Sequence, residues 1–140
     1  QPDPDNAAAV IAALLQAGHV NPEPARYELH RVWVVDSTLK SGTSHIYSRR
    51  TFYVDEDSWN ILAVDKYDGR GQLWRVGEAM LMQQYAQKVP VYAFEALYDI
   101  IAGRYIAIGM ANEEKTSVQY GTQASAKDFT PAALRNAGVR

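Results

Sequence analysis

The stretch TFYVDEDSWNILAVDKYDGRGQLWRV, residues 51–76, decides the fold. Apolar and polar residues alternate on either side of two acidic clusters, at residues 55–57 and 68–71. Alternation with a period of two is typical of β-strands, and Asp and Gly supply the backbone geometry of tight turns. The stretch therefore predicts three antiparallel strands joined by two hairpin turns.

A calcium site is the alternative interpretation of these acidic clusters. A calcium-binding loop needs oxygen ligands at alternating positions, a central Gly and a bidentate Glu further along the chain. Trp59 stands where the first cluster would need its third ligand, and the second cluster lacks the later Glu. The sequence therefore favours turns, and we expect no metal at either cluster.

The period of two continues on both sides of this stretch. Short links rich in turn residues separate the apolar runs, which is typical of an antiparallel meander. The Ala-rich residues 5–17 predict a helix, and Thr130, Pro131 and Gly138 suit the cap, the first turn and the end of a second helix. We predict strands over residues 27–36, 45–54, 59–67, 72–85, 91–99 and 104–110, and a polar irregular segment over residues 112–127.

The predicted fold is mainly β with some α (α+β): a curved antiparallel meander sheet or half-barrel with a short N-terminal helix and a short C-terminal helix. The chain has 140 residues, of which 47% are hydrophobic and 21% charged, and no cysteine. This composition suits a single domain over residues 1–140 and excludes thiol catalysis. The start QPDPDN has neither Met nor a signal peptide, which indicates a mature protein or a piece of a longer one.

A four-residue turn at each acidic cluster gives a definite strand register. It sets Phe52 opposite Ile61, Asp65 opposite Trp74, and Ile61 opposite Glu78, and it places Arg50 diagonally to Asp65. We expect Arg50 and Asp65 to form an ion pair, because either charge alone would be costly to bury. The N-terminal helix is expected to cover part of this aromatic face and to leave a groove. The apolar members of the face are Ile46, Phe52, Val54, Trp59, Ile61, Tyr67, Trp74 and Val76.

This face is the candidate binding site for a lipid or another hydrophobic molecule, because an aromatic wall needs few fixed polar contacts. Arg50 is expected to orient an anionic head group. No G-x-S-x-G elbow occurs, and the three histidines show no metal-ligand spacing, so we expect no catalytic residues, no metal and no cofactor. The net charge of −2 argues against a nucleic-acid partner. The candidate ligand-binding residues are Arg50, Phe52, Trp59, Ile61, Asp65, Tyr67, Trp74 and Glu78.

Four segments carry a resemblance to a known family. They are RYELHRVWVVDSTLKSG (26–42), HIYSRRTFYVDEDSW (45–59), YDGRGQLWR (67–75) and DFTPAALRNAG (128–138). Over nearly all of residues 20–138 the chain resembles the C-terminal part of domain of unknown function family 1329, whose members are labelled outer membrane lipoprotein-sorting protein-like. This family is similar to the lipoprotein carriers LolA and LolB, whose open half-barrel holds acyl chains under helices on its concave side.

The resemblance implies the C-terminal portion of a longer exported protein, in the periplasm or on the periplasmic face of the outer membrane of a Gram-negative bacterium. With the aromatic face, it predicts non-enzymatic binding of a lipid or hydrophobic amphiphile in periplasmic or outer-membrane transport. The expected partners are this ligand, an envelope exporter, and the N-terminal part of the same full-length protein. Two alternatives stay open: a module that docks on an exporter without holding a ligand, and a hydrolase of an envelope lipid.

Overall fold

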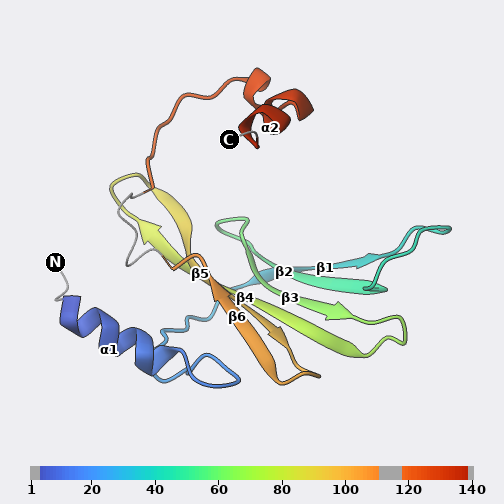
Figure 1. Cartoon of the computed structure of the whole chain (residues 1–140), viewed down its shortest axis with the longest axis horizontal. Coiled ribbons are helices and arrows are strands. Elements are labelled where there is room, and N and C mark those ends of the chain that lie inside the picture. Colours follow the sequence, from blue (N-terminus) through green and yellow to red (C-terminus); the bar gives the residue numbers. More distant parts are fainter. Residues whose placement is uncertain (1–3, 111–117, 139–140) are drawn as a thin grey trace.

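The computed structural model describes residues 4–110 and 118–138, with side chains from residue 8 onward. Its centre is one six-stranded antiparallel sheet in which each strand pairs with the next along the chain, in the order β1-β2-β3-β4-β5-β6 (Figure 1). The strands are β1 (Val32–Thr38), β2 (Arg49–Asp55), β3 (Ile61–Tyr67), β4 (Leu73–Gln84), β5 (Val89–Asp99) and β6 (Arg104–Ile108). The predicted curved meander sheet is confirmed.

Short helices lie at both ends of the described chain. The helix α1 (Pro4–Leu14) precedes the sheet, and the 3-10 turn η1 (Ala126–Phe129) and the helix α2 (Pro131–Ala137) follow it. Thr130 caps α2 by accepting a hydrogen bond from the backbone N–H of Ala133, with Pro131 in the first turn, as the sequence predicts. Of the predicted polar segment, residues 111–117 lie outside the described residues, and residues 118–125 form no helix or strand.

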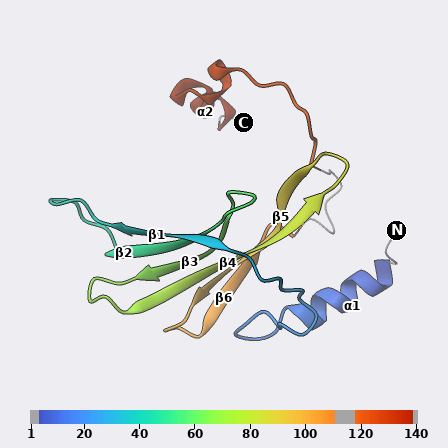
Figure 2. The ribbon, with the colours of Figure 1, turned by 180° about the vertical axis from the view of Figure 1, so that it is seen from behind.

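The first strand is shorter than predicted, because residues 27–31 belong to the segment that leads from α1 to β1. The turn after α1 packs near β5 and β6, whereas β1 is at the opposite edge of the sheet. The chain must therefore cross the sheet before β1 begins, and Figure 2 shows this segment running from α1 to β1. On the way, the hydroxyl of Tyr27 reaches the carboxylate of Glu78 on β4 at 3.4 Å.

Both acidic clusters form turns, as predicted. Asp55 donates its backbone N–H to the carbonyl of Asn60 at 2.9 Å, which closes the β2–β3 turn. Asp68 closes the β3–β4 turn with a backbone bond to Gln72 at 2.9 Å, and its side chain accepts from the N–H groups of Arg70 and Gln72. Asp side chains of this kind replace missing backbone partners in tight turns.

The predicted strand register is wrong. Phe52 pairs with Val64 rather than Ile61, Asp65 pairs with Val76 rather than Trp74, and Glu78 pairs with Ala63. There are two causes: both turns are longer than four residues, since Val54 pairs with Ile61 and Tyr67 with Leu73, and each hairpin also contains an irregularity, between Tyr53 and Val54 and between Lys66 and Tyr67. An extra residue in one strand moves the following side chains to the other face of the sheet.

The two faces of the sheet differ in what covers them. The end of α1 and the turn after it pack against one face, which we call the helix face. Its core consists of Val20, Phe94 and Ala96, with Leu14, Leu15, Met80, Tyr98, Tyr105, Ala107 and Met110 around it. The opposite face, which carries Phe52 and Val64, we call the groove face. The expectation that the N-terminal helix covers the face of Phe52 is therefore wrong, because the shifted register turns that face away from α1.

Candidate ligand-binding groove

An open groove of about 430 Å³ lies on the groove face. This volume falls within the usual range of small-molecule sites. Four neighbouring strands, β2 to β5, supply most of its walls, so the meander itself builds it. The lining residues are Tyr47, Arg50, Phe52, Ile61, Leu62, Ala63, Val64, Lys66, Gly77, Glu78, Ala79, Tyr92, Glu95 and Leu97.

The middle of the groove is apolar. Phe52, Val64, Gly77 and Leu97 are successive cross-strand partners from β2 to β5, so their side chains share one face. Gly77 is buried, and a Cβ atom added to it would lie 2.9 Å from Val64 Cγ1 and 3.2 Å from Leu97 Cδ2. Because Gly77 has no side chain, those of Val64 and Leu97 can pack over β4 and form the floor of the groove.

One end of the groove is bounded by Tyr92 and Glu95 on β5. The hydroxyl of Tyr92 lies 3.4 Å from the carbonyl oxygen of Ile61 at the start of β3. An irregularity in β5 accompanies this approach of β5 toward β3: Met80 pairs with Phe94 and Leu81 with Tyr92, which leaves Ala93 without a partner on β4. The bend in the long hairpin of β4 and β5 thus gives the groove a side wall.

The other end of the groove is basic. Arg50 and Lys66 line it, and Arg75 is the next residue along the same cross-strand row. Arg75 donates from Nε to Asp99 at 3.1 Å and from Nη1 to the hydroxyl of Tyr47 at 2.8 Å. The backbone N–H of Ala102 and the guanidinium of Arg75 lower the pKa of Asp99, so this acid is held ionised beside Arg75.

Four of the eight predicted binding residues line the groove. Arg50, Phe52 and Ile61 line it together. Glu78 borders it, but its carboxylate accepts hydrogen bonds from Tyr98 at 2.9 Å and Tyr27 at 3.4 Å. Because Tyr98 belongs to the surroundings of the helix-face core, the acidic group of Glu78 faces away from the groove.

Four predicted residues lie outside the lining. Asp65 and Tyr67 are on the helix face, where Asp65 accepts from the hydroxyl of Tyr53 at 2.9 Å, so the expected ion pair with Arg50 is absent from the structure. Trp59 is 71% exposed in the β2–β3 turn. Trp74 lies beside the groove. Its ring meets that of Tyr47 edge-on, with the two ring centroids 5.6 Å apart.

Sequence reasoning missed several lining residues. Lys66, Gly77 and Leu97 join the groove only through the shifted register, and Tyr47 reaches it from the segment before β2. The buried glycine is the one visible signal, because Gly inside a strand often marks a close approach to its surface.

One cluster of Ser, His and Asp has the wrong geometry for hydrolysis. The carboxylate of Asp55 stands in the middle, 2.9 Å from His30 Nδ1 and 2.6 Å from the hydroxyl of Ser58. A catalytic triad needs the imidazole between the serine and the acid, so that it can take the serine proton. This cluster therefore joins parts of the fold and does not activate Ser58.

In residues 4–110 and 118–138, no group of three His, Asp or Glu side chains is arranged to hold a metal ion. None of the helices in the same ranges has the length and apolar character to span a bilayer.

The fold and the groove define an open antiparallel sheet with one uncovered apolar face. Residues 4–135 match the family described as protein of unknown function (DUF1329), and the chain belongs to this family. The resemblance inferred from the sequence is thereby confirmed. The chain is also 56% identical over 127 residues to the uncharacterized protein PA3922 of Pseudomonas aeruginosa. That match covers 91% of this chain but 28% of the relative, so the chain spans less than a third of it.

Two solved structures resemble this fold. One is a domain from Vibrio parahaemolyticus whose name assigns it, provisionally, to outer membrane lipoprotein sorting. It matches 74% of this chain and 42% of that chain, with a TM-score of 0.53 and 19% identity. The other is a DUF1329 family protein from Desulfovibrio piger, with a TM-score of 0.49 and 18% identity over 74% of this chain and 40% of that chain. The likeness to the first concerns the fold alone.

Proposed function

We propose that the protein binds a lipid or another hydrophobic amphiphile in the groove, without chemical conversion, in the envelope of a Gram-negative bacterium. The observation that supports this most is the position of the groove. The end of α1 packs on the helix face, so the apolar floor of Phe52, Val64 and Leu97 is open on the other face. Burial of apolar ligand surface there contributes about 25 cal/mol per Å² before ordering costs.

The fold supports the same proposal. The Vibrio domain of related fold carries a name that refers to lipoprotein sorting in the outer membrane. A carrier of acyl chains needs an open sheet with an apolar face and no machinery for bond cleavage. Both features agree with the groove and with the arrangement around Asp55.

A binding experiment with a groove-filling variant tests this function. The protein, expressed at its full natural length, is titrated with N-phenyl-1-naphthylamine, a fluorescent and uncharged hydrophobic probe. We expect saturable binding, and we expect Ala79→Phe to weaken it about tenfold or more, because the new ring occupies the lined space. Ala86→Phe, at an exposed position in the β4–β5 turn, is the matched control and should leave affinity unchanged.

Two outcomes of the titration would contradict the proposed function. No saturable fluorescence with the unaltered protein contradicts the proposed function, as does equal binding by Ala79→Phe and Ala86→Phe. Organic extraction of the purified protein followed by mass spectrometry supplies the natural ligand. Cell fractionation with an antibody tests the envelope location, and recovery in the cytoplasm would contradict it.

A second proposal concerns the free edge of the sheet at β1. Trp33, Val34 and Val35 are exposed to 53%, 61% and 45%, so apolar groups are uncovered on both faces of one edge strand. Uncovered edges of this kind readily pair with another strand. Because this chain spans 28% of the Pseudomonas relative, we propose that the remaining part of such longer proteins covers β1.

A photo-crosslinking residue at Val34 tests this second proposal in the full-length protein. A crosslink within the same chain, located by peptide mass spectrometry, is the expected result. A crosslink to an exporter subunit, or none at all, would contradict it; the first of these would favour the docking module instead.

A further inference from the structure

A row of charged side chains crosses the sheet at the basic end of the groove. Lys66 on β3 is the cross-strand partner of both Arg50 on β2 and Arg75 on β4, and Arg75 is in turn partnered by Asp99 on β5. Three cations thus stand side by side with one carboxylate. Like charges directly opposite each other destabilise a sheet, so this row costs stability in the unliganded protein.

The single acid of the row is already engaged. Asp99 holds Arg75 at 3.1 Å and also accepts from the backbone N–H of Ala102 at 3.0 Å. Among the residues that the structure describes, no carboxylate oxygen comes within 4.0 Å of Arg50 or Lys66. Within residues 4–110 and 118–138, these two cations therefore have no ionic partner of the kind that Arg75 has in Asp99.

An imidazole and a phenol ring lie near Arg50 and Lys66. Arg50 Nη2 lies 3.3 Å from Nε2 of His45. The centroid of the Tyr47 ring lies 5.3 Å from Arg50 Cζ and 5.8 Å from Lys66 Nζ, at the outer range of cation–π contact. The hydroxyl of Tyr47 already accepts a hydrogen bond from Arg75. The ring of Tyr47 thus lies near both cations but carries no negative charge.

The charge changes sign along the groove. Lys66 stands at the basic end, the row of Val64 and Leu97 is apolar, and Glu95 lines the far end. Leu62 precedes Lys66 by four residues, which makes the apolar part roughly 13 Å long at the usual strand rise. A molecule with an anionic head and an apolar tail fits this pattern in one direction only, because Glu95 repels the head at the opposite end.

We propose that the groove selects an anionic amphiphile, whose carboxylate or phosphate head lies between Arg50 and Lys66. This inference rests on the proposed function and adds the chemical class of the ligand. Charge-assisted hydrogen bonds from a guanidinium and an ammonium group suit either head group. The ligand then removes the repulsion within the cationic row while its tail covers the apolar floor.

Three probes with similar tails separate head-group recognition from tail binding. Palmitate, palmitoyl lysophosphatidic acid and methyl palmitate are titrated calorimetrically, below their aggregation concentrations, into the protein at its full natural length. We expect at least one anionic probe to bind about tenfold more tightly than the ester. The anion that binds more tightly identifies the head group as carboxylate or phosphate.

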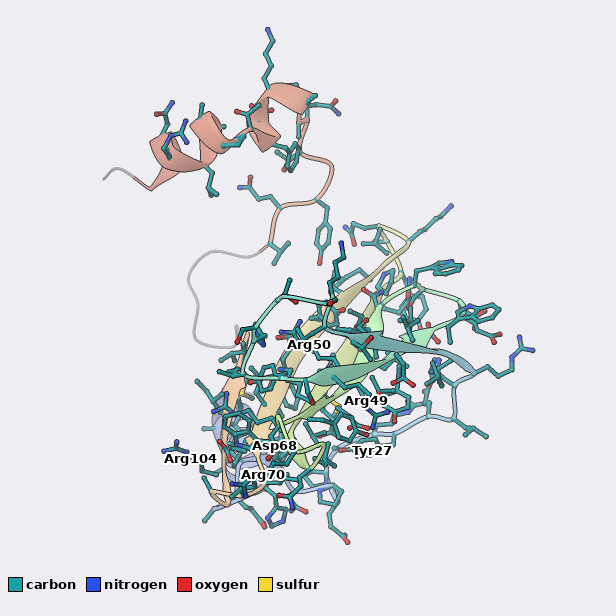
Figure 3. The ribbon with its side chains drawn as sticks, turned by 90° about the vertical axis from the view of Figure 1, so that its right-hand side faces the viewer. Tyr27, Arg49, Arg50, Asp68, Arg70 and Arg104 are labelled. Atoms are coloured by element: carbon teal, nitrogen blue, oxygen red, sulfur yellow. The ribbon has the colours of Figure 1, made fainter. Side chains whose placement is uncertain are left out.

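A double variant and a matched control complete the test. Arg50→Gln with Lys66→Gln should abolish the preference for the anions over methyl palmitate. Arg49→Gln removes a charge from the neighbouring position on β2, which faces the other way and stacks on Tyr67 at 3.9 Å, so the preference should persist (Figure 3). The double variant should melt at the same or a higher temperature, since it relieves repulsion.

Two results would overturn the inference while leaving the proposed function intact. One is equal affinity of the unaltered protein for the ester and both anions. The other is a preference for the anion that survives in the double variant. If none of the three probes binds, the container function fails and this inference fails with it.

Discussion

His30, just before β1, and Asp55, at the end of β2, are joined by a contact of 2.9 Å between Nδ1 and Oδ1. Asp55 is 3% exposed, and its other oxygen accepts from the backbone N–H and the hydroxyl of Ser58 at 2.9 and 2.6 Å. The Ser58 hydroxyl makes the largest contribution to lowering the pKa of Asp55, and His30 adds to it. One buried carboxylate thus connects the residue just before β1 to the β2–β3 turn.

Loss of the charge on Asp55 should therefore destabilise the fold. We expect Asp55→Asn to lower the free energy of unfolding by about 1–3 kcal/mol, because an amide cannot accept at both positions. Since the folded pKa is lower than the unfolded value, the contribution is present above pH 4 and is lost as pH falls through the folded pKa. Urea denaturation at pH 6 and pH 3 measures this, and the difference between the two proteins should shrink at pH 3. Asp57→Asn, at an exposed position of the same turn, is the control.

Tyr98 provides the opposite pH dependence. Burial and its hydrogen bond of 2.9 Å to Glu78 raise the pKa of this phenol well above its usual value of 10. The unfolded chain therefore loses this proton first, and stability should fall as pH rises above about 10. Tyr98→Phe should cost about 1 kcal/mol at pH 7, because Glu78 loses a donor. Thermal unfolding across pH 7 to 11 should show a weaker alkaline loss in the variant; an unchanged alkaline slope would contradict this assignment.

Trp59 carries backbone strain in the β2–β3 turn. Its φ angle is 60°, in the left-handed region that side chains other than Gly rarely adopt, and its ring is 71% exposed. Two variants separate the backbone from the ring: Trp59→Gly relieves the strain, whereas Trp59→Ala removes the ring and keeps the strain. We expect the Gly variant to be more stable than the Ala variant by about 1 kcal/mol in urea denaturation. Equal stability would mean that the turn relaxes without cost.

This turn also explains how far the sequence predicts the fold. Alternating apolar residues and Asp-rich turns predict the six-stranded meander and both terminal helices, because these signals are local. The left-handed Trp59 and the irregularities beside Val54 and Lys66 follow no local preference. Each is selected by contacts between distant segments, such as the backbone bond from Glu56 to Arg31. The turns were thus predictable, and their exact lengths were not.

The same uncertainty in turn length limits how far the candidate site is predictable from the sequence. Arg50, Phe52 and Ile61 were placed together at the groove because β2 and the start of β3 keep the predicted alternation. Asp65 changed sides with the register, and so the expected partner of Arg50 was lost. Lys66 took the place opposite Arg50, which converted an expected ion pair into a pair of like charges. The register between β2 and β3 differs from the predicted one by three residues, since Phe52 pairs with Val64 rather than Ile61. This difference altered the inferred ligand chemistry more than it altered the inferred fold.

Gly77 allows a direct test of how tightly the groove floor is built. A methyl group at this position would lie 2.9 Å from Val64 Cγ1, closer than real contacts allow, and 3.2 Å from Leu97 Cδ2. We expect Gly77→Ala to destabilise the protein by about 1–3 kcal/mol, as overpacking does. The displaced side chains should also narrow the groove and weaken binding of N-phenyl-1-naphthylamine.

Gly69→Ala is the matched control for this substitution. A Cβ at Gly69 meets nothing within 4 Å, and its φ angle lies outside the left-handed region, so the change should be neutral or stabilising by up to about 1 kcal/mol. Urea denaturation and the probe titration on both variants give the comparison. If Gly77→Ala matches Gly69→Ala in stability and affinity, then Val64 and Leu97 rotate freely away from β4, and the floor of the groove is not a fixed surface.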